Sequence, residues 1–145
     1  LYNMKAKLEN VKFCLPVLFK LQLPSFKLHF TNVYITPLTI PDYPDLHIAT
    51  LLSHPAPNII AGDFNSSHPT WLGRVHHSGN TLVAMAQTFN CDIVIPPSHT
   101  FILAYTILDF FITKGVIKQR TAVLQEGLSD HYPEILKTDT MAASK

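Results

Sequence analysis

Charged side chains are scarce in this sequence. Asp, Glu, Lys and Arg make up 14% of the 145 residues, whereas about a quarter is usual for a soluble domain. The net charge is +1, so the chain has no strong overall attraction for nucleic acid. Hydrophobic residues make up 47%, enough for the core of one ordinary domain. We therefore expect a single domain over residues 1–145 with exposed apolar surface, and any DNA binding must come from a local arrangement.

Cysteine is nearly absent as well. Cys14 and Cys91 are the only two, and no secretory signal pattern precedes them, so we expect reduced thiols in an intracellular protein. Two widely spaced cysteines also disfavour a zinc site. The longest apolar stretches, 13–19 and 93–108, are too short or are interrupted, and a membrane span needs about 20 apolar residues. No membrane span is expected.

Short strands and short helices alternate along the chain. Alternating apolar and polar residues predict a strand over 26–35. Apolar runs predict further strands at 58–62, 91–95, 107–113, 116–124 and 132–137, and helical spacing predicts helices at 46–53 and 80–90. A polar loop is expected at 63–78, and the first 23 residues show no clear pattern. The alternation indicates an α/β or α+β fold.

Polar residues of chemical interest lie next to these apolar strands. Asp63 and Asn65 directly follow the strand at 58–62, and Asp109 lies within an apolar run, where an unpaired carboxylate is costly. Three polar residues, 129–131, precede the last strand. This placement predicts a cleft in which carboxylates, an amide and an imidazole converge, with oxygen ligands suited to Mg²⁺.

Each of these residues also has an ordinary structural interpretation. Asp63 and Asn65 are common turn residues. Asp109 can be satisfied by a backbone N–H within its strand, and His131 can be a simple packed histidine. The combination favours the functional interpretation more than any single member does.

Three short motifs in order carry a family resemblance. Gly62-Asp63-Phe64-Asn65, Leu108-Asp109-Phe110-Phe111 and Ser129-Asp130-His131 resemble successive signatures of the endonuclease/exonuclease/phosphatase superfamily, and 32–37 resembles its Tyr-x-x-Pro strand. That superfamily includes apurinic endonucleases, pancreatic deoxyribonuclease and inositol polyphosphate phosphatases. The flanks, 63–71 and 108–115, are similar to the endonucleases of jockey-type non-LTR retrotransposons. The resemblance covers about residues 11–137.

The resemblance implies a DNase-I-like four-layer fold, a two-sheet β-sandwich with flanking helices. Nothing in the sequence matches the family's first strand or the segment with its metal-binding glutamate. Glu9 and Asn10 stand in the wrong order and are interpreted as surface residues. We therefore expect an N-terminally truncated domain, a partial sandwich that lacks its first strands.

The resemblance also implies roles in hydrolysis of a phosphodiester. Asp63 orients or deprotonates the attacking water, and Asn65 helps to hold it. His131 contacts the scissile phosphate with Asp109 as its hydrogen-bonding partner, and Tyr34 touches the phosphate. In retrotransposons such a nick exposes the 3′ end that primes reverse transcription.

A metal and a DNA surface follow from the same resemblance. Asp130, supported by Ser129, is the expected ligand of Mg²⁺ or Mn²⁺, bound weakly in the absence of the glutamate. His68, Trp71 and Arg74 are candidate DNA contacts. Action on DNA implies the nucleus, and no stable protein partner is implied.

Three interpretations of function remain open. The first is a Mg²⁺-dependent DNA-nicking endonuclease with impaired catalysis. The second is a non-catalytic, transposon-derived fragment that at most binds nucleic acid or protein. The third, a phosphatase of small molecules, is disfavoured by the retrotransposon-like segment 68–71. His68, His76 and His77 fit a loop near DNA better than a metal cluster.

Overall fold

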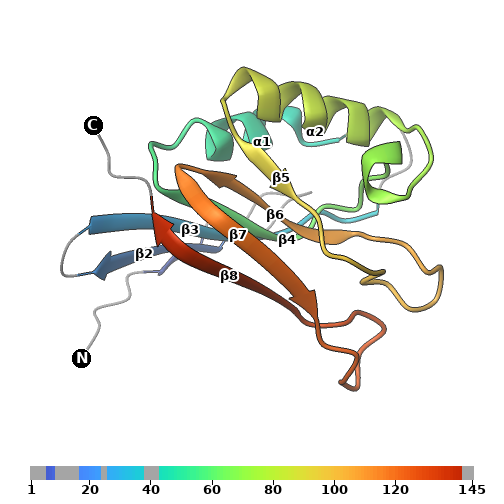
Figure 1. Cartoon of the computed structure of the whole chain (residues 1–145). Coiled ribbons are helices and arrows are strands. Elements are labelled where there is room, and N and C mark those ends of the chain that lie inside the picture. Colours follow the sequence, from blue (N-terminus) through green and yellow to red (C-terminus); the bar gives the residue numbers. More distant parts are fainter. Residues whose placement is uncertain (1–5, 9–16, 24–25, 38–42, 142–145) are drawn as a thin grey trace.

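The computed structural model describes residues 6–8, 17–23, 26–37 and 43–141 (Figure 1). Six strands form one sheet in the order β1-β2-β3-β4-β6-β5, and β7 and β8 form a second sheet. The larger sheet consists of β1 (Ala6–Leu8), β2 (Val17–Leu23), β3 (Phe26–Tyr34), β4 (Asn58–Asp63), β6 (Asp109–Lys114) and β5 (Asp92–Val94). The smaller consists of β7 (Val116–Val123) and β8 (Glu134–Met141), and the helices are α1 (Asp45–Leu52), the 3₁₀ helix η1 (Pro69–Trp71) and α2 (His77–Thr88).

Strand β4 is the centre of the larger sheet. It runs parallel to β3 and antiparallel to β6. The parallel connection from β3 to β4 requires a crossover, and α1 lies in that crossover. This mixed topology, two sheets with few helices, confirms the expected α/β class.

Two cores separate three layers of structure. On one face of the larger sheet, α1 and α2 lie side by side (Figure 1) and pack on residues such as Ile60 and Phe110. On the other face, Ile59 and Phe111 pack with Val116 of the second sheet. Successive side chains of a strand point to opposite faces, so the consecutive apolar residues of β4 and β6 fill both cores.

The expected elements are present with shifted bounds, and two strands were missed. Strands β1 and β2 lie in the N-terminal segment that showed no pattern. Strand β2 pairs with β3 over its whole length, so its hydrogen bonds come from a partner that a local pattern does not reveal. Helix α2 begins at His77 rather than Asn80, and η1 interrupts the predicted polar loop.

The described residues leave several large apolar side chains exposed, among them Leu46, Leu72, Leu103 and Tyr105. Cys91 is a free, partly buried thiol. Cys14, Glu9 and Asn10 lie outside the described residues. None of the described helices combines the length and apolar character needed to cross a membrane.

Candidate active site

Three neighbouring strands bring polar side chains to the same level of the larger sheet. In the strand register, Tyr34 of β3 is opposite Asp63 of β4, and Asp63 is opposite Asp109 of β6. Asp63 and Asp109 each lie two residues from Ala61 and Phe111, and so on the same face as those side chains, which pack toward the second sheet. The two carboxylates therefore belong to the same face, at the end of β4 and the start of β6.

Phe64 anchors the chain directly after Asp63. Its ring is 1% exposed and stacks on Phe110 with centroids 4.5 Å apart. Its N–H donates to the carbonyl of Leu108 at 2.9 Å. Because this side chain enters the core, the residues on either side of it face the other way, toward the site.

Asn65 holds the Asp63 carboxylate. Its backbone N–H donates to Asp63 Oδ1 at 2.8 Å, and its side-chain Nδ2 donates to Asp63 Oδ2 at 3.0 Å and to the Ile35 carbonyl at 2.6 Å. Its φ of 41° is a left-handed conformation that asparagine tolerates better than most residues. The expectation was an amide that holds the attacking water. The amide contacts the Asp63 carboxylate, and its role toward the water remains a proposal.

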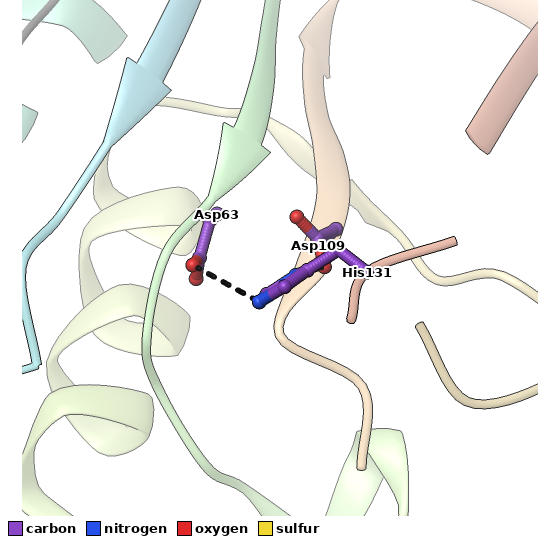
Figure 2. Close-up of side chains that lie close together, drawn as sticks. All are labelled: Asp63, Asp109 and His131. Atoms are coloured by element: carbon purple, nitrogen blue, oxygen red, sulfur yellow. Dashed lines mark hydrogen bonds and ion pairs between the residues drawn. The ribbon is translucent and has the colours of Figure 1, made fainter. Parts of the chain in front are cut away.

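His131 completes the group from the loop before β8. Its Nδ1 is 2.7 Å from Asp109 Oδ2, and its Nε2 is 4.0 Å from Asp63 Oδ2. Figure 2 shows the imidazole lying against Asp109 and directed toward Asp63. The side chains of His131 and Asp63 are 28% and 11% exposed, so solvent reaches the imidazole while the carboxylate is largely covered. The expected Asp109–His131 pair is therefore present.

The environment raises two pKa values in this group. Burial, reinforced by the Asp109 charge, raises the pKa of Asp63 to about 6, although hydrogen bonds from Asn65 and the His131 charge oppose the shift. Partial burial of His131 works to lower its pKa, but the hydrogen bond and charge of Asp109, with the charges of Asp63 and Asp130, raise it above 6.5 overall. A carboxylate with a pKa of about 6 next to an imidazole with a raised pKa suits proton transfer.

The same three side chains are a possible metal-binding group. One ligand atom each from Asp63, Asp109 and His131 lie within 4.8 Å of one another. Two carboxylates suit a hard cation such as Mg²⁺, which usually takes one or two of them with water completing its shell. The donor set therefore fits a divalent cation, while His131 Nδ1 is already engaged by Asp109.

Ser129 and Asp130 lie on the exposed loop that carries His131. Ser129 Oγ accepts from the His131 backbone N–H at 3.2 Å and donates to Asp130 Oδ1 at 3.3 Å. Asp130 is exposed and lies outside the three-residue group above. Its assignment as a metal ligand remains a proposal.

The candidate DNA contacts separate into exposed and buried residues. Tyr34 is 44% exposed, and Arg74 is exposed as well. Trp71, in contrast, is 1% exposed, packs against Phe110 and donates its Nε1–H to the Ser66 carbonyl at 3.2 Å. The expected Trp71–DNA contact is therefore not available in this conformation, because a large apolar ring is more stable in the core.

Two of the loop histidines cap helices. His68 Nδ1 accepts from the Thr70 N–H at the start of η1, and His76 Nδ1 accepts from the Ser78 N–H at the start of α2. These bonds satisfy donors that a helix N-terminus leaves free. Of the described histidines, only His131 belongs to a group of possible metal ligands.

An open pocket of about 290 Å³ adjoins the site, and sequence reasoning missed it. Asn32, Asp109 and Glu134 contribute its polar lining. Burial, with the nearby Asp109 charge, raises the pKa of Glu134 to about 8, and its Oε1 is buried without a hydrogen-bond partner among the described residues. The sequence signal is a single glutamate at the start of a strand, a common feature.

Similarity to solved structures supports the same fold. The endonuclease domain of TRAS1, a telomere-specific non-LTR retrotransposon, matches with a TM-score of 0.68 and 14% identity, over 92% of this chain and 66% of that domain. The cytolethal distending toxin of Actinobacillus actinomycetemcomitans matches with a TM-score of 0.55 and 16% identity, over 86% of this chain and 53% of the toxin chain. Beta toxin of Staphylococcus aureus matches at 0.52 with 15% identity, over 86% and 57% of the two chains.

These likenesses establish the fold alone, because all three sequence identities are low. The chain spans less than two thirds of each matched structure. No curated protein sequence matches the chain. Residues 28–135, the greater part of the chain, match the Exo_endo_phos_2 family, described as endonuclease-reverse transcriptase. The chain thus belongs to this family of retrotransposon-type, endonuclease-like domains within the endonuclease/exonuclease/phosphatase superfamily.

Proposed function

We propose that this chain is a metal-dependent DNA endonuclease that nicks one strand by hydrolysis of a phosphodiester. The observation that carries the proposal is the Asp109–His131–Asp63 arrangement, with 2.7 Å and 4.0 Å between successive partners. The family supports this reaction class, and the retrotransposon to which the similar TRAS1 domain belongs supports a DNA substrate. Action on chromosomal DNA takes place in the nucleus.

In the proposed reaction, Asp63 accepts a proton from the attacking water. The water oxygen forms a bond to phosphorus, the P–O3′ bond breaks, and the 3′ oxygen takes up a proton from solvent. A carboxylate with a pKa of about 6 is ionised at neutral pH yet basic enough for this transfer. The product is a strand with a free 3′-hydroxyl, the end that primes reverse transcription in retrotransposons.

His131 supplies positive charge to the scissile phosphate. Its raised pKa keeps a larger protonated fraction at neutral pH. Asp109 holds the ring by Nδ1 and leaves Nε2 to face the substrate side, near Asp63. Charge aimed in advance at the phosphate stabilises the transition state, in which negative charge shifts onto the oxygens. Exposed Tyr34, opposite Asp63 in the register, is the proposed neutral contact to the same phosphate.

A divalent cation, Mg²⁺ or Mn²⁺, is the proposed cofactor. The exposed Asp130 and the Asp109 carboxylate would hold it, which leaves Asp63 to act as the base, and when bound it would neutralise charge on the phosphate oxygens. Asp109 is already engaged by His131, so few carboxylate oxygens remain. We therefore expect weak binding and slow turnover. Half-buried His68 and exposed Arg74 are the proposed contacts to the DNA backbone.

Nicking of supercoiled plasmid by the purified chain tests the proposal. We expect Mg²⁺-dependent conversion to open circles, lost on chelation, and reduced about 10²- to 10³-fold by His131→Ala. His77→Ala removes an exposed histidine outside the group and serves as the matched control. If a folded sample gives no cleavage, or cleavage unaffected by His131→Ala, the chain is a non-catalytic member that at most binds nucleic acid or protein.

A further inference from the structure

Thr100 is a fully buried residue that neither the motifs nor the catalytic proposal includes. It lies between β5 and β6 and is 0% exposed. Its Oγ1 accepts two backbone hydrogen bonds, from Leu108 N–H at 3.0 Å and from Asp109 N–H at 3.1 Å. A single hydroxyl therefore fixes the backbone at the residue that carries the His131 partner.

The main chain of Thr100 holds the other half of the pair. Its carbonyl accepts from the Tyr132 N–H at 2.8 Å, next to His131. The following residue, Phe101, forms an isolated β-bridge with His131, and the two rings lie with centroids 4.9 Å apart. Ile102 N–H donates to the Asp130 carbonyl at 2.9 Å. Three consecutive residues thus hold the 130–132 backbone.

We propose that Thr100 is the positioning residue of the Asp109–His131 pair, because it is hydrogen-bonded to the backbone of Asp109 and to the backbone beside His131. The two members come from segments 22 residues apart in sequence. Their 2.7 Å contact depends on both backbones being held against one common element. The expected effect of Thr100 on catalysis rests on the proposed function, whereas its positioning of the pair does not.

The positioning role follows from the scarcity of other hydrogen-bond acceptors at a buried site. The N–H groups of Leu108 and Asp109 both use Thr100 Oγ1, and a buried donor without a partner is costly. Loss of the hydroxyl therefore favours a backbone shift that lets these donors find another acceptor. Such a shift moves the Asp109 carboxylate relative to the imidazole, and a displacement of about 1 Å at a reacting group is enough to reduce turnover about 10²-fold.

Thr100→Val and Thr100→Ser form the test pair. Valine keeps the shape and removes the oxygen, whereas serine keeps the oxygen. Titration of the His131 ring, followed by NMR in the metal-free chain, should show a lower imidazole pKa in Thr100→Val and a value close to the parent in Thr100→Ser. Where nicking is measurable, Thr100→Val should lower kcat about 10²-fold with KM nearly unchanged, and serine should restore it.

Thr31→Val is the matched control. Thr31 is also 0% exposed, in β3 of the same sheet, and its hydroxyl has no hydrogen-bond partner within the described part of the chain. Its substitution should leave the His131 titration unchanged. If Thr100→Val titrates like the parent, or if Thr31→Val shifts His131 equally, the positioning role is wrong.

Two further outcomes separate the positioning role from the catalytic proposal and from a failure of the variant to fold. If the parent chain does not nick DNA but Thr100→Val still shifts His131, the catalytic proposal fails and the positioning role stands. If Thr100→Val does not fold, amide exchange in the parent decides. The Leu108 and Asp109 N–H groups should exchange as slowly as those within β4, and rapid exchange would overturn the inference.

Discussion

Asp109 has two electrostatic effects on its neighbours. Its hydrogen bond and charge raise the pKa of His131, and its charge also raises the pKa of Asp63. Both effects favour the protonated form, one by attraction to a cation and the other by repulsion between carboxylates. The proposed base, Asp63, and the proposed cationic contact to the phosphate, His131, are therefore coupled through one residue.

Asp109→Asn tests this coupling, because it keeps the shape of the side chain and removes its negative charge. We expect the pKa of both His131 and Asp63 to fall toward their ordinary values, measured by NMR titration of the metal-free chain. Nicking should fall about 10²-fold, since the imidazole loses its charged partner. Asp92→Asn, at an exposed position of β5, is the control. Movement of only one of the two pKa values would contradict the coupling.

At the scale of elements, the site depends on how closely β3 and β4 approach. Gly62 lies within β4 at a φ of +137°, a conformation that favours glycine. A Cβ at this position would stand 2.0 Å from the Val33 carbonyl oxygen. A side chain here would push apart the strands that carry Tyr34 and Asp63.

Gly62→Ala and Gly127→Ala separate this steric effect from backbone strain. Gly127 has nearly the same φ, +138°, but its added Cβ would meet nothing nearer than 3.9 Å. We expect Gly127→Ala to reduce the free energy of unfolding by about 1 kcal/mol, and Gly62→Ala by about 3 kcal/mol or more. Urea denaturation measures both. Equal losses in the free energy of unfolding would mean that β3 and β4 can separate to admit the Cβ at no energetic cost, which would contradict the steric effect.

For the whole molecule, stability should fall as pH rises. The carboxyl groups of Asp63 and Glu134 have folded-state pKa values of about 6 and about 8, against ordinary values of 3.8 and 4.5. They bind protons more tightly in the folded chain, so deprotonation favours unfolding over these windows. The raised pKa of His131 acts in the same direction, because its contribution is present at low pH and is lost as pH rises through that pKa.

We therefore expect the free energy of unfolding to decline between about pH 5 and pH 8. Glu134→Gln, which cannot ionise, should flatten the decline and stabilise the chain at pH 8 by about 2 kcal/mol, a value reduced for its partial exposure. Glu126→Gln, at an exposed loop position, is the control. Denaturant titrations across the pH range measure the slope. A parent chain equally stable at both ends would contradict the prediction.

Much of the fold and of the site could be predicted from local sequence. The alternation around buried Leu28 in β3 and the apolar run of β4 follow directly from burial on one or both faces of a sheet. The Asp63-Phe64-Asn65 motif places two polar residues around one core aromatic. These features depend on near neighbours in the chain, so the sequence displays them.

The Asp109–His131 pairing itself was expected from the family resemblance and is confirmed by the 2.7 Å contact. Other features needed the tertiary structure. The strand β2, the burial of Trp71, the pocket at Glu134 and the role of Thr100 each depend on contacts between distant segments. The sequence around Thr100 is that of any threonine in a loop. Its hydroxyl finds its donors at Leu108 and Asp109, and its carbonyl finds its donor at Tyr132, only once the chain has folded.

The sequence by itself predicted which residues are candidates for the chemistry and near which strands they lie, because hydrophobic periodicity and short motifs are local properties. The tertiary structure decided which carboxylate is buried, which amide holds it and which residue holds the histidine. Burial, pKa and hydrogen bonding depend on the groups that surround a side chain in space, and most of those groups are far away in the chain.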